Sequence, residues 1–230
     1  MLYLRQLTRF AALGLVLAST TLSLRAQGTS AVTFTDSTPD TFSVSQQVIG
    51  FDFTVSIALT VTALGFYDLG GDGLAVSHAI GLWGPDAPVI IEPPLAQTTV
   101  PAGTSGLLQD SFRYQAISPL TLSPGITYTI GAFTQTNAQS GAGMVDLYFS
   151  QLTSGQVVLA PGIVLGDAKT STIDQPGLTR PAVNFSGANL GFFGPGFLVQ
   201  PIPEPSVSVL LAIALVGGAY LARWRRKPRA

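Results

Sequence analysis

The sequence contains no cysteine, only one histidine and little charge of either sign. Among its 230 residues, charged side chains make up 10% and apolar side chains 47%. The absence of cysteine excludes disulfide bonds, thiolate zinc sites, thiol nucleophiles and iron–sulfur clusters. The apolar content is far from that of a disordered chain, while 25 glycines and 16 prolines predict many turns. The length suffices for one or two ordinary domains.

Basic residues are scarce in the middle of the chain. Between Gln27 and Ile202 only Arg113, Lys169 and Arg180 are basic, against eleven acidic side chains, so this stretch has a formal charge of three minus eleven, or −8. The other basic residues gather near the two ends. Because nucleic acids need a basic stripe to neutralise their phosphates, the sequence argues against nucleic-acid binding.

The first 26 residues have the three-part pattern of a secretory signal peptide. Arg5 and Arg9 precede an apolar run that begins at Phe10, and the small residue Ala26 predicts cleavage between Ala26 and Gln27. The two arginines are not adjacent, so the twin-arginine route is not indicated. The alternative, a buried helix, lacks a helix cap and a second polar face. We therefore expect the protein to be exported.

The last 29 residues, 202–230, also have three parts. Pro203, Glu204 and Pro205 come first, followed by the uncharged run 206–222 and then by basic residues. The basic residues are Arg223, Arg225, Arg226, Lys227 and Arg229. As a helix the run would rise about 25 Å, slightly less than the hydrocarbon core of about 30 Å, so it would span with thinning or snorkelling. The basic residues predict a cytoplasmic end, with the acidic middle outside.

These three parts together resemble the PEP-CTERM sorting tail of Gram-negative bacteria, over Ile202 to Arg229. The resemblance implies processing by an exosortase, a membrane-embedded transpeptidase-like protease that removes the helix and delivers the protein to the cell exterior. It also implies an association with exopolysaccharide or the biofilm matrix. Pro203, Glu204 and Pro205 would be the recognised residues. The alternative is a simple, permanent anchor in the inner membrane.

Residues 27–201 have the pattern of β-structure. Residues 48–56, 108–116 and 126–132 alternate between apolar and polar side chains. Residues 59–67 change phase near Ala63 and Leu64, which predicts a bulge or burial on both faces. Further strands are predicted at 31–35, 79–83, 95–100, 120–122, 145–151, 157–159 and 180–185.

The many short strands and glycine-rich or proline-rich turns predict an all-β fold, an antiparallel β-sandwich of jelly-roll type. It would follow an N-terminal signal helix and precede a C-terminal transmembrane helix. No stretch between the ends has a convincing helical period. Residues 189–200 combine three phenylalanines with glycine and proline, so they form either a last strand pair or the linker out of the domain.

A second resemblance covers residues 41–132. It is carried by residues 61–68, 71–74, 77–78, 81–83, 100–104 and 112–114. These are similar to an extracellular bacterial domain family of unknown function that often precedes PEP-CTERM tails. The resemblance implies a β-sandwich and no activity. The proline-rich stretch 85–94 departs from the family.

The residues that could carry chemistry are few. His78 is the only histidine, and no Gly-x-Ser-x-Gly elbow accompanies it, so a packed or solvent-facing histidine is favoured over a catalytic base. Asp68 and Asp72 lie in a glycine-rich segment that is either a tight turn or an incomplete calcium loop, because a third acid and a closing glutamate are missing. No acidic pair is marked out for sugar hydrolysis.

The aromatic residues Tyr67, Trp83, Tyr114 and Tyr148 either belong to the core or form a surface for stacking sugars. The leading prediction is a secreted, non-enzymatic surface or matrix protein that has no catalytic residues and no cofactor. The alternative is a glycan-binding module, dependent on calcium or not, on a simple anchor. A hydrolase of matrix polymers is a third hypothesis for which the sequence offers no recognisable site.

Overall fold

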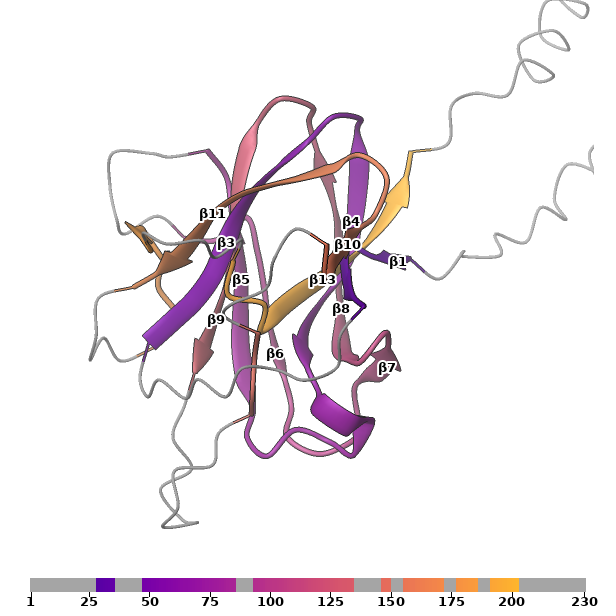
Figure 1. Ribbon diagram of the computed structural model, residues 1–230, viewed down its shortest axis with the longest axis vertical. Coiled ribbons are helices and arrows are strands. Elements are labelled where there is room, and N and C mark those ends of the chain that lie inside the picture. Colours follow the sequence, from indigo (N-terminus) through magenta and orange to yellow (C-terminus); the bar gives the residue numbers. More distant parts are fainter. Residues whose placement is uncertain are drawn as a thin grey trace, which may run out of the picture.

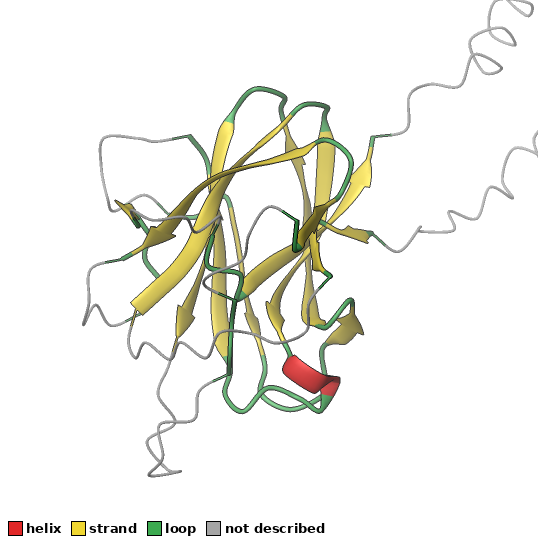
Figure 2. Ribbon diagram, in the orientation of Figure 1, coloured by secondary structure: helices red, strands yellow, loops and turns green. Residues whose placement is uncertain are grey.

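The structure is a computed structural model that describes residues 28–35, 47–85, 93–134, 146–149, 155–171, 177–185 and 191–202. These residues form an all-β domain in which two antiparallel sheets pack face to face (Figures 1 and 2). Within these ranges no helix is long and apolar enough to cross a membrane. The predicted signal peptide 1–26, with its cut between Ala26 and Gln27, and the tail 203–230 lie outside the described residues.

The five-stranded sheet brings the first and last described strands together. Its order is β1-β13-β4-β8-β7, and β13 pairs antiparallel with both β1 and β4. The strands are β1 (Thr29–Ser30), β4 (Leu59–Tyr67), β7 (Leu107–Gln109), β8 (Phe112–Leu122) and β13 (Pro195–Pro201).

The six-stranded sheet has the order β12-β11-β3-β9-β5-β6. Its strands are β3 (Gln47–Val55), β5 (His78–Trp83), β6 (Ala96–Val100), β9 (Thr127–Thr134), β11 (Ile163–Thr170) and β12 (Val183–Asn184). A separate ribbon pairs β2 (Val32–Phe34) with β10 (Val157–Leu159). One short helical turn, η1 (Leu69–Gly71), follows β4.

Aromatic side chains fill the space between the sheets. The ring centroids of Phe53 on β3 and Phe197 on β13 lie 4.7 Å apart, and Phe51 lies 5.1 Å from Phe193. All four rings are fully buried. Burying an aromatic side chain removes a large apolar area from water, at about 25 cal/mol per Å2, so these rings hold the two sheets together without disulfides.

Most strand predictions are confirmed. The described part of the predicted strand 145–151 forms only an isolated bridge at Phe149, and β11 was not predicted. The phase change in residues 59–67 is a bulge, because the register of β4 against β8 shifts between Val61 and Ala63. The single strand predicted for residues 108–116 is wrong. The chain reverses at Asp110 and Ser111, both with positive φ (50° and 63°), and a β7–β8 hairpin results. Most of residues 189–200 is no linker, because β13 lies inside the five-stranded sheet.

Candidate functional site

The guanidinium of Arg113, on β8, is surrounded by oxygen acceptors at one end of the sandwich. Its Nε donates to Oδ2 of Asp68 at 2.7 Å, and its Nη atoms donate to the carbonyl oxygens of Gly71 (2.8 Å), Thr104 (2.8 Å) and Gly106 (3.2 Å). Both charged side chains are almost inaccessible to solvent, with 5% and 2% exposed. The pair is therefore a buried ion pair that ties two loops to β8.

Asp68, Gly71 and Thr104, which contact this guanidinium, are among the residues that carry the second family resemblance. The N–H of Gly73 donates to both carboxylate oxygens of Asp68 at 3.2 Å, and the N–H of Asp68 donates to the carbonyl of Ser111 at 2.8 Å. Leu74 and Gly103 form a bridge between the two loops. Residues that are far apart in the sequence thus build one clamp. Its polar groups face one another, which indicates a structural role for these positions.

The alternative of an incomplete calcium loop needs both Asp68 and Asp72 as ligands. The surroundings of these two residues differ. Asp68 is buried and its charge is compensated by Arg113, whereas Asp72 is exposed. A calcium site needs several free oxygen ligands around one point. Across the described ranges no group of three or more histidine, aspartate or glutamate side chains could hold a metal ion. The carboxylate of Asp68 is occupied by Arg113 and by the N–H of Gly73.

His78, the only histidine, lies at the start of β5 and is fully buried. Of the two predictions that the sequence favoured, a packed and a solvent-facing histidine, the packed one is confirmed. Its ring stacks on Phe66 with centroids 3.6 Å apart and an interplanar angle of 2°. Nε2 lies 2.8 Å from Oδ2 of Asp146, and Nδ1 lies 3.2 Å from the carbonyl oxygen of Phe133. The two nitrogens therefore face a backbone carbonyl and a carboxylate. Among the described residues, the partners of the two nitrogens are Asp146 and the backbone of Phe133, whereas the base of a Ser–His–Asp triad contacts a serine hydroxyl.

Asp146 is held by three donors, and sequence reasoning did not single it out. The N–H groups of Ala75 and Val76 donate to its carboxylate at 2.8 and 3.1 Å, in addition to the contact with His78. Burial by itself raises the pKa of this carboxyl, but the hydrogen bonds and the charge of His78 outweigh burial and place the pKa below its usual value. The contact joins a segment of four described residues to the start of β5.

The other two basic residues of the domain, Lys169 and Arg180, also have partners inside it. Lys169 lies 2.9 Å from Oδ2 of Asp52, whose Oδ1 accepts a hydrogen bond of 2.6 Å from Thr129. Arg180 donates to the carbonyl of Gly84 at 2.9 Å and to Oγ1 of Thr129 at 3.2 Å. Asp52 and Thr129 are paired across β3 and β9, so both contacts meet at the six-stranded sheet.

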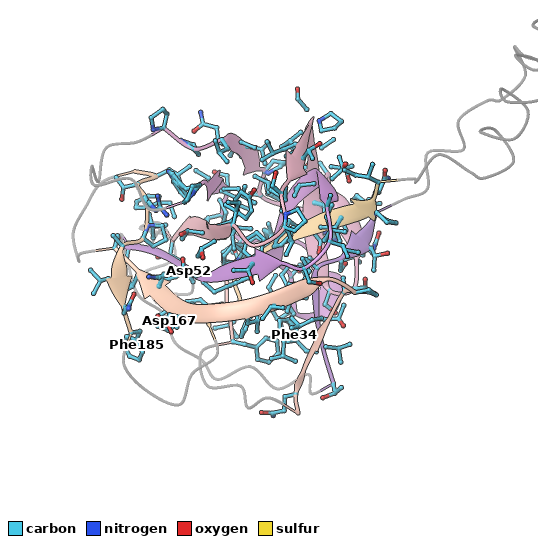
Figure 3. All side chains as sticks on the ribbon, turned by 90° about the horizontal axis from the view of Figure 1, so that it is seen from above. Phe34, Asp52, Asp167 and Phe185 are labelled. Carbon is cyan, nitrogen blue, oxygen red and sulfur yellow. The ribbon has the colours of Figure 1, made fainter. Side chains whose placement is uncertain are left out.

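The exposed charge of the described surface is consequently of one sign. Arg113, Lys169 and Arg180 are all buried. The exposed charged residues within the described ranges are Asp72, Asp110 and Asp167. Asp167 lies on β11, and Figure 3 labels it near the buried Asp52 of the neighbouring strand β3. This surface therefore repels polyanions.

The four aromatic residues that could have stacked on sugars are core residues. Tyr67, Trp83, Tyr114 and Tyr148 are each at most 3% exposed. The hydroxyl of Tyr114 bonds to Ser30 at 3.1 Å, and burial raises its pKa, so the phenol stays protonated. The reading that places them in the core is confirmed.

A shallow groove of about 570 Å3 crosses the outer face of the five-stranded sheet. Its polar side chains include Thr60, Thr62 and Gln200, and no charged residue lines it. The sequence could not reveal this groove, because its residues come from β4, β7, β8 and β13 and from the segment before β1. Its chemistry suits a neutral, hydroxyl-bearing ligand better than an ion.

No family model, curated protein or solved structure matches this chain. The two resemblances therefore remain predictions, carried by the residues named above.

Proposed function

We propose that this chain is an exported, non-enzymatic protein of the cell surface or extracellular matrix. An exosortase reads Pro203, Glu204 and Pro205, and residues 206–222 occupy the inner membrane before the tail is removed. The folded domain is then delivered outside the cell, where it associates with exopolysaccharide.

The observation that carries this proposal is the position of the last strand. β13 ends at Pro201, and Pro203 is the second residue beyond it. β13 is also a central strand of its sheet, so the fold depends on residues up to this point. A protease that reads the motif would act next to a complete domain without unfolding it.

The strand order supports a jelly roll as the finer description of the fold. The order β1-β13-β4-β8 in one sheet and β3-β9-β5-β6 in the other corresponds to strands 1-8-3-6 and 2-7-4-5 of a jelly roll. β11 and β12 extend the second sheet as an insertion before the last strand. This fold occurs in binding and coat proteins, so it fits a role in display, by analogy only.

Replacing Glu204 tests the sorting step. We expect Glu204→Ala to leave folding unchanged and to block release of the domain, so that the chain accumulates in the membrane fraction. Asp72→Ala is the matched control, because it removes one exposed carboxylate from the described surface. Normal processing of the Glu204 variant, measured by immunoblot of cell and culture fractions, would contradict the proposal.

The uncharged groove favours binding of a neutral glycan as a second candidate function. Thr62 lies among the groove residues, whereas Thr121, also exposed in part on the same sheet, does not line it. We expect Thr62→Lys to abolish retention on an immobilised neutral polysaccharide and Thr121→Lys to leave it unchanged. Absence of retention by the parent protein on a panel of neutral polysaccharides would dismiss this candidate.

A further inference from the structure

The first and the last described residues of the domain lie at the same end of the sandwich. Thr29 of β1 pairs with Val199 of β13, so the chain before β1 and the chain after β13 start close together. Pro201 pairs with Leu59, at the end of the five-stranded sheet where β4 begins. Figure 1 shows the tip of β13 beside the turns at the top of the view.

Three turns lie at the same end of the sandwich as the end of β13. The N–H of Ser56, in the β3–β4 turn, donates to the carbonyl of Gly162 in the β10–β11 turn at 2.8 Å. The N–H of Gly125, in the β8–β9 turn, donates to the carbonyl of Val55 at 2.9 Å. These bonds make the turns one continuous surface. We call it the exit face and define it by its exposed apolar residues, Ile57, Pro124, Pro161, Pro201 and Ile202.

The exit face carries no charged side chain among the described residues. Ile57 and Ile202 are 47% and 41% exposed, although large aliphatic side chains are ordinarily buried. The exposed carboxylates lie elsewhere. Asp72 and Asp110 are near the opposite end, where β4 finishes and β8 begins, and Asp167 lies partway along β11. In Figure 2 the short helical turn marks that opposite end.

The sequence leaves little chain between the exit face and the apolar run. Only Pro203, Glu204 and Pro205 separate Ile202 from residue 206. Three extended residues reach about 10 Å, at about 3.1 Å per residue. The headgroup layer on each side of a bilayer is itself about 5 to 8 Å thick. A domain tethered so closely must therefore keep its exit face at the headgroups whenever residues 206–222 are in the bilayer.

We propose that the exit face rests on the lipid surface during the membrane stage, with Asp72 and Asp110 pointing away from the membrane. This inference rests on the proposed function, because it requires residues 206–222 to enter the bilayer. The short tether supplies a high local concentration, so weak apolar contacts suffice. The uncharged surface avoids repulsion from anionic lipids. The contact orients the domain and places Glu204 in the narrow gap where a membrane-embedded protease works.

Because the chain has no cysteine, a single introduced cysteine gives one labelling site. Ile57→Cys and Pro124→Cys place a fluorophore on the exit face, and Asp72→Cys and Asp110→Cys place it at the opposite end. The exported full chain is purified from membranes of a host without exosortase. It is then reconstituted into phosphatidylethanolamine and phosphatidylglycerol vesicles that carry a quencher on the lipid headgroup.

We expect at least twofold stronger quenching at positions 57 and 124 than at positions 72 and 110. Equal quenching at both ends, in chains that float with the vesicles, would overturn the orientation and leave the sorting proposal intact. A chain that does not float with the vesicles would refute the membrane stage and this inference with it.

A charge placed on the exit face gives a second test. In the chain labelled at position 124, we expect Ile57→Glu to reduce the quenching at least twofold, and Ile57→Ser to reduce it less. Leu69→Glu is the matched control, because Leu69 is 39% exposed in η1 at the opposite end. Equal effects of Ile57→Glu and Leu69→Glu would contradict the proposal.

Discussion

Single polar groups decide much of the stability of this domain, because almost every buried one has a partner. Tyr148 is the exception: it is 1% exposed, and among the described residues its hydroxyl has no hydrogen-bond partner. Burial raises the pKa of this phenol, so the group stays neutral. A neutral hydroxyl without a partner still loses its hydrogen bonds to water on folding, and that loss destabilises the folded state.

Removing this hydroxyl should stabilise the protein. We expect Tyr148→Phe to raise the free energy of unfolding by about 1 kcal/mol and Tm by about 3 °C. Tyr128→Phe is the matched control. The hydroxyl of Tyr128 accepts a bond of 2.9 Å from the N–H of Ser123, so its removal should lower the free energy of unfolding by about 1 kcal/mol. Urea unfolding checks both, and a loss of stability in Tyr148→Phe would refute the argument.

The contact of Asp146 with His78 predicts a loss of stability in acid. The pKa of Asp146 in the folded chain lies below its usual value of 3.8, so its ionised form stabilises the fold above about pH 4. That contribution is lost as the pH falls through the folded pKa. We expect Asp146→Asn to be less stable than the parent at pH 6 and to show a flatter decline below pH 4. Thermal unfolding from pH 2 to 7 measures this, with Asp72→Asn as control; an unchanged acid profile in Asp146→Asn would count against it.

At the scale of elements, loops and strands are fixed by close contacts that tolerate little change. The guanidinium of Arg113 holds η1 and the segment after β6 against β8, and it compensates the charge of Asp68. In the six-stranded sheet, Gly50 of β3 pairs with Gly131 of β9, which in turn pairs with Gly81 of β5. A Cβ on Gly131 would lie 2.9 Å from Pro181, and a Cβ on Gly81 would lie 2.5 Å from the ring of Trp83, so these glycines leave room for both side chains.

Replacing Arg113 alone should lower the free energy of unfolding more than replacing Arg113 and Asp68 together. Arg113→Met leaves the carboxylate of Asp68 buried and uncompensated, so we expect a loss of about 3 to 5 kcal/mol in the free energy of unfolding. The double variant Arg113→Met, Asp68→Leu should recover part of this loss, because no unpaired charge remains. A double variant less stable than Arg113→Met would contradict this account.

The glycine row predicts a steep difference between two alanine substitutions. A Cβ atom on Gly50 would lie 1.9 Å from the carbonyl oxygen of Ile130, a backbone atom of the paired strand. We expect Gly50→Ala to cost at least about 3 kcal/mol. Gly125→Ala meets nothing within 4 Å and pays only for its positive φ of 74°, about 1 kcal/mol. Chemical denaturation of both variants measures the difference, and similar losses would refute it.

For the molecule as a whole, the described surface is anionic and the basic residues of the tail lie beyond the domain. Mass spectrometry of the native protein should place its C-terminus between Pro203 and Ser206. The released form should then pass a polyanion column at low salt, because the described domain exposes no basic side chain. A native protein that retains Arg225 and Arg226 would indicate a permanent anchor, and the exosortase proposal would fall.

Local pattern determined the all-β class and the limits of most strands, because period-two alternation needs only one buried face per strand. The alternation failed to predict a strand or a buried side chain where tertiary contacts changed it. β11 was missed because its register against β3 shifts between Leu165 and Ala168, which breaks the alternation. The outer face of β3 was taken as polar, yet Asp52 there is buried against Lys169.

The sequence by itself also determined the export and sorting predictions, because charge order and apolar length are read along the chain. Only the tertiary structure decided what the few charged residues do. Arg113 meets Asp68, and His78 meets Asp146, across sequence separations of 45 and 68 residues. It also placed the exit face at the end of β13. No spacing rule specifies such pairs, since they depend on how two sheets and their loops pack in space.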